Sequence, residues 1–295
     1  MDDLAQVLDS AVVAREFPHD QPDLLEDEIV FCYFSKPSTR TRVSFAAAIA
    51  HLGGEAEFMG PGDLQLGRGE TIEDTAMVVS GYARSAVIRT FDHADVVRFA
   101  SAATIPVINA LTDLHHPCQA LADMLTIRDH FGALNGSRLA YVGSGNNVVH
   151  SLIQAGALTG VHTVVATPVE LAPDPRIVEG ARAAGGDVEL VTDPIEAVAG
   201  ADVVYTDVWL SMGDPPEEQE ARRALLAPYQ VNPDLLARAD DSAVFLHCLP
   251  AHRGDEVVDE VLDGDRSLVA VQAENRLHTE QAMLAALLTG SLAGR

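Results

Sequence analysis

Lysine is almost absent from this chain of 295 residues: Lys36 is the only one, and arginine supplies the other basic side chains. Acidic side chains outnumber basic ones by 44 to 19, which gives a formal net charge of −25. Such a charge repels nucleic acid and anionic membranes, so we expect neither as a partner. The acids are spread along the whole chain, whereas a binding face for a basic partner would gather them in a block. The spread is typical of a cytoplasmic protein from a high-salt organism, where ions screen the self-repulsion.

Cysteine and long apolar runs are also scarce. The three cysteines, Cys32, Cys118 and Cys248, are odd in number and far apart in the sequence, which disfavours a disulfide scaffold and fits a reducing cytosol. No apolar run reaches membrane-spanning length, and the acidic N-terminus lacks the pattern of a signal peptide. We therefore expect a cytoplasmic protein with a sizeable core and two domains.

Short apolar runs alternate with amphipathic stretches throughout the chain. Strands are expected at residues 29–34, 86–90, 105–109, 138–142, 162–166, 187–191, 203–206 and 244–248. Helices are expected at 71–82, 117–131 and 274–288, the first with Thr71 and Asp74 at the spacing of a capping box. This alternation predicts an α/β fold with two doubly wound domains around parallel central sheets.

One polar, glycine-bearing segment, residues 129–136, separates an expected helix from an expected strand. We place the domain boundary there, with a first domain at 1–130 and a second at 131–274. The C-terminal helix, within 275–295, is expected to return to the first domain.

The string Ser38-Thr39-Arg40-Thr41-Arg42 carries the strongest functional signal. It follows the buried strand expected at 29–34 and opens a helix-like run. The N-terminus of a helix carries partial positive charge and unpaired N–H donors, so it binds phosphate-like anions. The planar fork of arginine suits phosphate oxygens. The alternative is a helix cap with solvated arginines, which is disfavoured in a chain that otherwise avoids positive charge.

Further polar side chains follow other expected strands, where ligands of parallel sheets bind. Arg89 ends the buried run Val87-Ile88 and therefore needs an anionic partner there, although it is alternatively a surface residue. His116 is either a helix-capping residue or, with Gln119 one turn further on, a group that polarises a carbonyl and holds an amide.

The second half of the chain offers weaker patterns. Gly143-Ser144-Gly145 after a strand is similar to a dinucleotide-binding loop, but Val148 stands where its third glycine belongs, so a tight turn into a helix is favoured. The histidines and cysteines lack the spacing of a compact zinc site, and no metal is expected. Cys248 is either a nucleophile or a positioning group, because the sequence pairs no base with it.

Taken together, the motifs resemble the aspartate/ornithine carbamoyltransferase family, and within it the ornithine carbamoyltransferases. The matching strings occur in family order: K-P-S-T-R-T-R at 36–42, R-G-E-T-I-E-D-T-A at 68–76, H-P-C-Q at 116–119, N-N at 146–147, D-V-W-L-S-M-G at 207–213, H-C-L-P-A-H-R-G at 247–254 and E-N-R at 274–276. S-T-R-T-R and H-P-x-Q mark carbamoyl transfer generally, and S-M-G with H-C-L-P points to ornithine.

The resemblance implies a role for each matching residue. The residues implied to bind carbamoyl phosphate are Ser38, Thr39, Arg40, Thr41, Gln65, Arg89, His116, Pro117, Cys118, Gln119, Cys248, Leu249 and Arg276. Gln65 is implied to reach into the site of a neighbouring subunit. The residues implied to bind L-ornithine are Asn147, Asp207, Ser211 and Met212. Arg89, His116, Cys248 and Asp207 are implied to be catalytic.

The implied reaction transfers the carbamoyl group of carbamoyl phosphate to the δ-amine of L-ornithine, in the direction of arginine biosynthesis or, reversed, in the arginine deiminase pathway. It needs no cofactor, because carbamoyl phosphate is already activated, and family members are trimers or assemblies of trimers. Three alternatives stay open: a different acceptor amine, a non-catalytic binding protein that kept the fold, and a nucleotide-dependent oxidoreductase.

Overall fold

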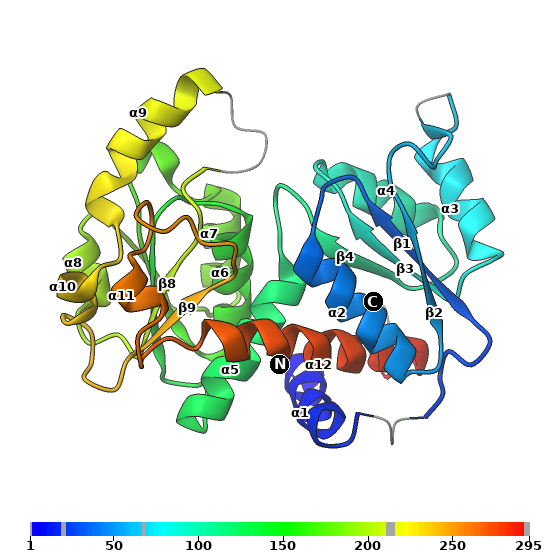
Figure 1. Cartoon of the computed structure of the whole chain (residues 1–295), viewed down its shortest axis with the longest axis horizontal. Coiled ribbons are helices and arrows are strands. Elements are labelled where there is room, and N and C mark those ends of the chain that lie inside the picture. Colours follow the sequence, from blue (N-terminus) through cyan, green and yellow to red (C-terminus); the bar gives the residue numbers. More distant parts are fainter. Residues whose placement is uncertain (1, 19–21, 67–68, 211–215, 292–295) are drawn as a thin grey trace. The chain divides into compact units, whose positions relative to one another are not determined.

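The computed structural model of the chain describes residues 2–18, 22–66, 69–210 and 216–291. It divides into two compact units, Met1–Ala122 with Glu274–Arg295, and Asp123–Ala273 (Figure 1). The division between Ala122 and Asp123 falls inside helix α5 (Pro117–Phe131), before the polar segment at 129–136. Each unit contains one parallel sheet with helices on both faces, as the alternating pattern predicts.

The first unit is built on a four-stranded sheet. Its strands lie in the order β2 (Glu55–Met59), β1 (Ile29–Phe34), β3 (Ser85–Arg89) and β4 (Val107–Leu111), all parallel. After β1 the chain first adds β2 on one side and then β3 on the other. The direction of winding therefore reverses between β1 and β3, which is where doubly wound sheets bind ligands.

The two faces of this sheet are covered by different helices. Helices α3 (Ile72–Ser80) and α4 (His93–Ala102) cover one face, and α2 (Thr39–His51), α5 and α12 (Val269–Leu288) cover the other (Figure 1). Helix α1 (Asp2–Glu16) belongs to the same unit. Successive side chains of β1 alternate between these faces, so Cys32 packs with α2 and α12 while Phe31 packs with α3 and α4.

The second unit has a five-stranded parallel sheet. Its strand order is β7 (Val188–Val191), β6 (His162–Ala166), β5 (Arg138–Val142), β8 (Val203–Thr206) and β9 (Val244–His247). The reversal here lies between β5 and β8. Helices α8 (Pro194–Val198), α10 (Pro233–Leu236) and α11 (Asp259–Leu262) pack on one face, and α6 (Asn147–Thr159) with α7 (Pro175–Ala183) on the other (Figure 1). Helix α9 (Pro216–Leu226) completes this unit.

Most expected elements are present with bounds shifted by up to two residues, as for β4, which was expected at 105–109. Two differences are larger. The strand β2 was not predicted, because Glu55 and Glu57 interrupt its apolar pattern at the exposed edge of the sheet. Helix α12 begins at Val269, earlier than the expected start at residue 274, and continues through the division between the units. It has 20 residues; within the described ranges, no helix combines the length and apolar character that crossing a bilayer requires.

The turn after β5 explains the glycines of Gly143-Ser144-Gly145. Gly143 has a φ of +144°, which side-chain-bearing residues rarely adopt. A Cβ on Gly145 would lie 2.3 Å from the backbone N of Pro173 and 2.6 Å from the carbonyl oxygen of Leu171. The backbone N–H of Gly145 donates to that same oxygen at 2.7 Å. Close backbone approach therefore accounts for this glycine, in agreement with a tight turn into a helix.

We expect Gly145→Ala to destabilise the protein by about 3 kcal/mol, because backbone atoms cannot move aside as a flexible side chain does. Gly180→Ala is the matched control, since among the described residues nothing beyond its own stretch of helix α7 lies within 4 Å of its Cβ position. That change should leave stability equal or higher by up to about 1 kcal/mol. Denaturant unfolding of both variants measures the difference, and equal midpoints would contradict the close approach.

Candidate active site

In the first unit, the loop after β1 turns directly into helix α2. Ser38 is the N-cap of this helix, and its hydroxyl accepts a hydrogen bond from the backbone N–H of Thr41 at 3.3 Å. The Thr41 side chain is buried, while Arg40 is half-buried and Arg42 is exposed with its guanidinium over the ring of Phe58. The start of α2 thus presents hydroxyl and N–H donors together with one partly buried guanidinium, which suits an anion.

Arg89 ends strand β3 beside this loop. It is the register partner of Phe34, the last residue of β1, and its backbone oxygen accepts from the backbone N–H of Ser35 at 2.9 Å. Only 7% of Arg89 is exposed. Burial and the guanidinium of Arg89 both lower the pKa of Lys36, so positive charge gathers where β1 and β3 end.

Helix α5 brings the expected imidazole and amide to the same unit. Pro117 is its first residue, a position that tolerates the missing N–H. The carbonyl oxygen of His116 accepts from the backbone N–H groups of Gln119 and Ala120, both at 3.2 Å. The side chains of His116 and Gln119 are buried. Cys118 is fully buried, and its thiol donates to the carbonyl oxygen of Asn109 at 3.5 Å.

Arg276 on helix α12 connects these segments. Its NH1 group donates to Oε1 of Gln119 at 3.0 Å, and its NH2 group donates to Oγ1 of Thr41 at 3.2 Å. Only 2% of Arg276 is exposed, and Oε1 of Glu280 accepts from its Nε and NH2 groups. A guanidinium from the C-terminal helix therefore joins α2 and α5 at one point.

The pKa of His116 is held well below its usual value, first by burial and then by Arg276, Arg89 and Arg40. Those three guanidiniums, which come from three different parts of the chain, therefore all act electrostatically on one imidazole. The imidazole is neutral near pH 7 and presents one N–H donor and one acceptor. Burial raises the pKa of the Cys118 thiol to about 12, so this cysteine stays protonated.

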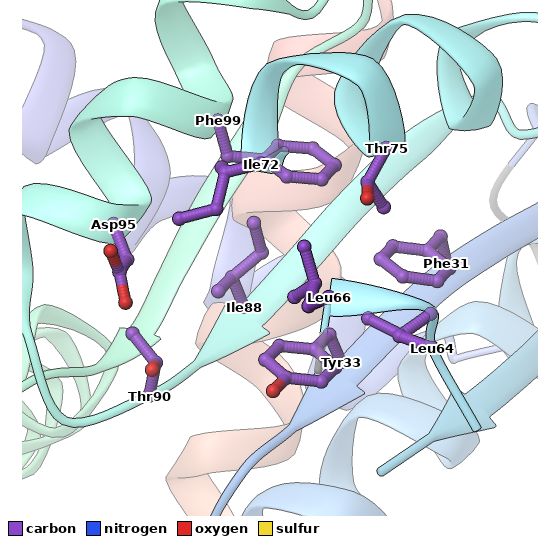
Figure 2. A pocket seen from close by; sticks show the side chains of 10 residues that line it. All are labelled: Phe31, Tyr33, Leu64, Leu66, Ile72, Thr75, Ile88, Thr90, Asp95 and Phe99. Carbon is purple, nitrogen blue, oxygen red and sulfur yellow. The ribbon is translucent and has the colours of Figure 1, made fainter. Parts of the chain in front are cut away.

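A cavity opens on the opposite face of the same sheet (Figure 2). Leu64 and Leu66, the neighbours of Gln65 in sequence, line it together with apolar side chains of β1, β3, α3 and α4. This packing anchors the loop that carries Gln65 to the α3 and α4 side of the sheet. Among the described residues, none of those expected to bind substrate lines this cavity.

In the second unit, the polar cluster centres on Asp207 after strand β8. Oδ2 of Asp207 accepts from Nδ2 of Asn146 at 2.7 Å, and Oδ1 accepts from the thiol of Cys248 at 2.9 Å. Asn146 is also the N-cap of α6, where its Oδ1 accepts from two backbone N–H groups. Three loops, after β5, β8 and β9, thus meet at a carboxylate that is 6% exposed.

His247 stabilises the loop after β9 through hydrogen bonds of its ring. Its Nδ1 accepts from the backbone N–H of Leu249 at 2.8 Å, and its Nε2 lies 3.2 Å from Oε1 of the fully buried Glu256. Glu256 therefore selects the tautomer with a proton on Nε2. Leu249 has a φ of +57°, a left-handed conformation that this contact helps to hold.

Within the described residues, one group has the geometry to hold a metal ion: Asp207, His247 and Cys248 each offer a ligand atom within 4.8 Å of the others. The side chains of these three residues also make the hydrogen bonds given above. The sequence has no C-x-x-C pair that would add further ligands.

Two expected ornithine-binding residues, Ser211 and Met212, lie outside the described residues. Asn147 is the first residue of α6 and is half-buried, beside the Asn146 cap. Sequence reasoning did not select Arg222, although its guanidinium donates to the carbonyl oxygen of Trp209 and the hydroxyl of Ser144, both at 2.7 Å. Arg222 lies in a helix with many charged residues, so its sequence context does not indicate a functional role.

Comparison with known proteins identifies both units. Residues 1–129 match the aspartate/ornithine carbamoyltransferase carbamoyl-P binding domain, and residues 135–287 match the Asp/Orn binding domain of the same family.

Similar proteins cover nearly the whole chain. An anabolic ornithine carbamoyltransferase of Pyrococcus furiosus is 52% identical over 271 residues, which is 90% of this chain and 86% of that protein. The ornithine carbamoyltransferase of Symbiobacterium thermophilum is 50% identical over 293 residues, 97% of this chain and 94% of its own. The solved structure of the ornithine carbamoyltransferase from P. furiosus superposes with a TM-score of 0.93 at 48% identity, covering 98% of this chain and 94% of that one.

The depressed pKa of His116 predicts a pH dependence of stability. The unfolded chain binds a proton at this histidine below pH about 6.5 and the folded chain does not, so stability falls as the pH is lowered through that value. Between pH 7 and 5.5 this costs about 1 kcal/mol. The loss in unfolding free energy over that interval should be smaller in His116→Gln by this amount. His130→Gln, at an exposed position, should retain the wild-type loss.

Proposed function

This chain belongs to the aspartate/ornithine carbamoyltransferase family, and on that premise we propose that it transfers the carbamoyl group of carbamoyl phosphate to the δ-amine of L-ornithine. The products are L-citrulline and phosphate. One observation carries the assignment of the first substrate: the guanidiniums of Arg40, Arg89 and Arg276 all act electrostatically on the neutral, buried His116 of the first unit.

The phosphate group binds at the start of helix α2. The hydroxyl and N–H groups of Ser38, Thr39 and Thr41 bind its oxygens, and Arg40 and Arg89 balance its charge. These groups remain in place as the phosphate becomes the leaving group, so they also stabilise the charge that develops on it.

The carbamoyl group binds beside them, at the start of α5. The N–H of the neutral His116 donates to the carbonyl oxygen, which gains negative charge when the amine adds to the carbon. Gln119, fixed by Arg276, binds the carbamoyl nitrogen through its amide. The Cys118 thiol is buried, protonated and hydrogen-bonded to the carbonyl oxygen of Asn109, so it does not contact the substrate. Pro117 and Cys118 instead contribute through the backbone of this turn.

Ornithine binds in the second unit, at the switch point between β5 and β8. The Asp207 carboxylate, oriented by Asn146 and Cys248, binds an ammonium group of the substrate. Asn147, Ser211 and Met212 complete the proposed contacts. Cys248 acts here as a hydrogen-bond donor that positions Asp207. The backbone of the next residue, Leu249, is fixed by its hydrogen bond to Nδ1 of His247.

The chemistry needs no redox or acyl-carrying cofactor. The neutral δ-amine forms a bond to the carbamoyl carbon, the bond from that carbon to the phosphate oxygen breaks, and one amine proton passes to the departing phosphate. The ammonium form of the free amine has a pKa of about 10.4 by analogy with lysine, so the step requires loss of a proton before or during attack. Positioning both substrates contributes much of the rate.

Several finer features belong to the same proposal. We expect a homotrimer or an assembly of trimers, with Gln65 reaching the site of a neighbouring subunit, because the family resemblance implies it. A cytoplasmic location fits three cysteines that all lie in the described part of the chain and form no disulfide. The net charge of −25 supports a protein adapted to high salt.

The first test is citrulline formation from carbamoyl phosphate in molar KCl, with ornithine, putrescine, lysine, N-acetylornithine and aspartate compared as acceptors. Ornithine-specific turnover supports the assignment, and its loss at low salt supports the halophilic interpretation. Light scattering of the same sample measures the oligomer. A folded protein that binds phosphate but uses no acceptor would instead be a non-catalytic relative.

Arg40→Ala should weaken carbamoyl phosphate binding and lower kcat/KM by roughly a hundredfold or more, because a charged hydrogen bond to the leaving group is lost. Arg42→Ala is the control, since that guanidinium lies exposed over Phe58. It should change kcat/KM less than about threefold. Steady-state kinetics with the fold checked by circular dichroism separates them, and equal effects would contradict the phosphate site.

Asp207→Asn should raise the KM for ornithine at least about tenfold and leave the binding of carbamoyl phosphate nearly unchanged. The amide keeps the size of the side chain but removes its charge. Asp187→Asn, at a side chain that is 76% exposed in the same unit, should change neither. Equal losses for both substrates in the Asp207 variant would argue against its assignment to ornithine.

A further inference from the structure

Glu280 is a buried carboxylate that the proposed reaction does not use. It lies one helical turn after Arg276 on α12, and its side chain is completely buried. Its Oε1 accepts from Nε of Arg276 at 3.0 Å and from NH2 at 2.6 Å. The same guanidinium donates to Gln119 and Thr41, so the single side chain of Arg276 links Glu280 to two residues of the proposed carbamoyl phosphate site.

A buried carboxylate beside a proposed anion site repels the anion, so its presence there requires an explanation. The pKa of the Glu280 carboxyl is raised, because the effect of burial outweighs those of Arg276 and the Ser44 hydroxyl, which lower it. The carboxylate also raises the pKa of two buried thiols, Cys32 and Cys118. Its negative charge therefore acts across the interior of this unit, and it opposes the binding of any further anion there.

Without a counterion, the buried guanidinium of Arg276 would be costly in the empty site. Glu280 supplies that counterion before substrate arrives. It also fixes the plane of the guanidinium, because both of its hydrogen bonds use the Nε and NH2 edge while NH1 faces Gln119. The pair therefore orients Arg276 and reduces its net charge at the same time.

We propose that Glu280 is a positioning residue that holds Arg276 ready in the empty site and lowers the affinity of that site for phosphate-bearing ligands. The inference rests on the proposed function, because it assumes that this cluster binds carbamoyl phosphate. In an enzyme that must release phosphate after each turnover, the internal carboxylate competes with the product for Arg276 and favours its release.

Isothermal titration of the whole protein with inorganic phosphate tests the proposal. Glu280→Gln keeps an oxygen that accepts from Arg276 but removes the charge, so the Kd for phosphate should fall about five- to tenfold. Its melting temperature without phosphate should fall, because Arg276 loses its counterion, and phosphate should restore much of it. In kinetics, the KM for carbamoyl phosphate and the inhibition constant of phosphate should fall together, with the KM for ornithine unchanged.

Three further variants control the interpretation. Glu274→Gln removes an exposed charge from the same helix and should change the Kd for phosphate less than twofold. Glu280→Asp keeps the charge and should bind phosphate within about twofold of the wild type. Glu280→Leu removes the charge with an apolar side chain and should tighten binding as Glu280→Gln does, which keeps the test available if the latter folds poorly.

The outcomes distinguish failure of the role of Glu280 from failure of the proposed function. Unchanged or weaker phosphate binding by folded Glu280→Gln and Glu280→Leu, in a protein whose wild type makes citrulline, would overturn the role of Glu280 alone. A wild type that neither binds phosphate nor makes citrulline would overturn the proposed function and this inference with it.

Discussion

A buried guanidinium, that of Arg276, is the constraint on which the first unit depends. Its contacts with Thr41 on α2, Gln119 on α5 and Glu280 on α12 join three helices that are distant in sequence. Charge in a low-dielectric interior is tolerated only when its hydrogen bonds are satisfied. The same contacts that stabilise the charge therefore also fix the geometry of the proposed anion site, so stability and the proposed binding have one structural origin.

Both units place their polar clusters by the same rule. In the first, the winding of the sheet reverses between β1 and β3, and the loop proposed to bind phosphate and Arg89 stand at those two strand ends. In the second, it reverses between β5 and β8, and Asn146 meets Asp207 there. At a reversal, the loops of neighbouring strands lead to opposite faces and leave room for side chains and a ligand.

The two clusters differ in their electrostatics. The first gathers guanidiniums around a neutral imidazole, and the second gathers neutral donors around one carboxylate, Asp207. An anion suits the first and an ammonium group the second, which matches the charges of the two proposed substrates. In a chain with a net charge of −25, the positive cluster requires burial, because screening and the surrounding acids would weaken an exposed one.

The sequence by itself determined the α/β fold, the strand ends that bear polar residues and the family, because each depends on local periodicity or on contiguous motifs. The strands at 138–142 and 162–166 coincide with β5 and β6 for this reason. The strand β2, the hydrogen bond from Arg222 to Ser144 and the pairing of Glu280 with Arg276 required the tertiary structure. A charged residue in a helix has the same local pattern whether it is solvated or buried, and only the packing of distant segments decides which it is.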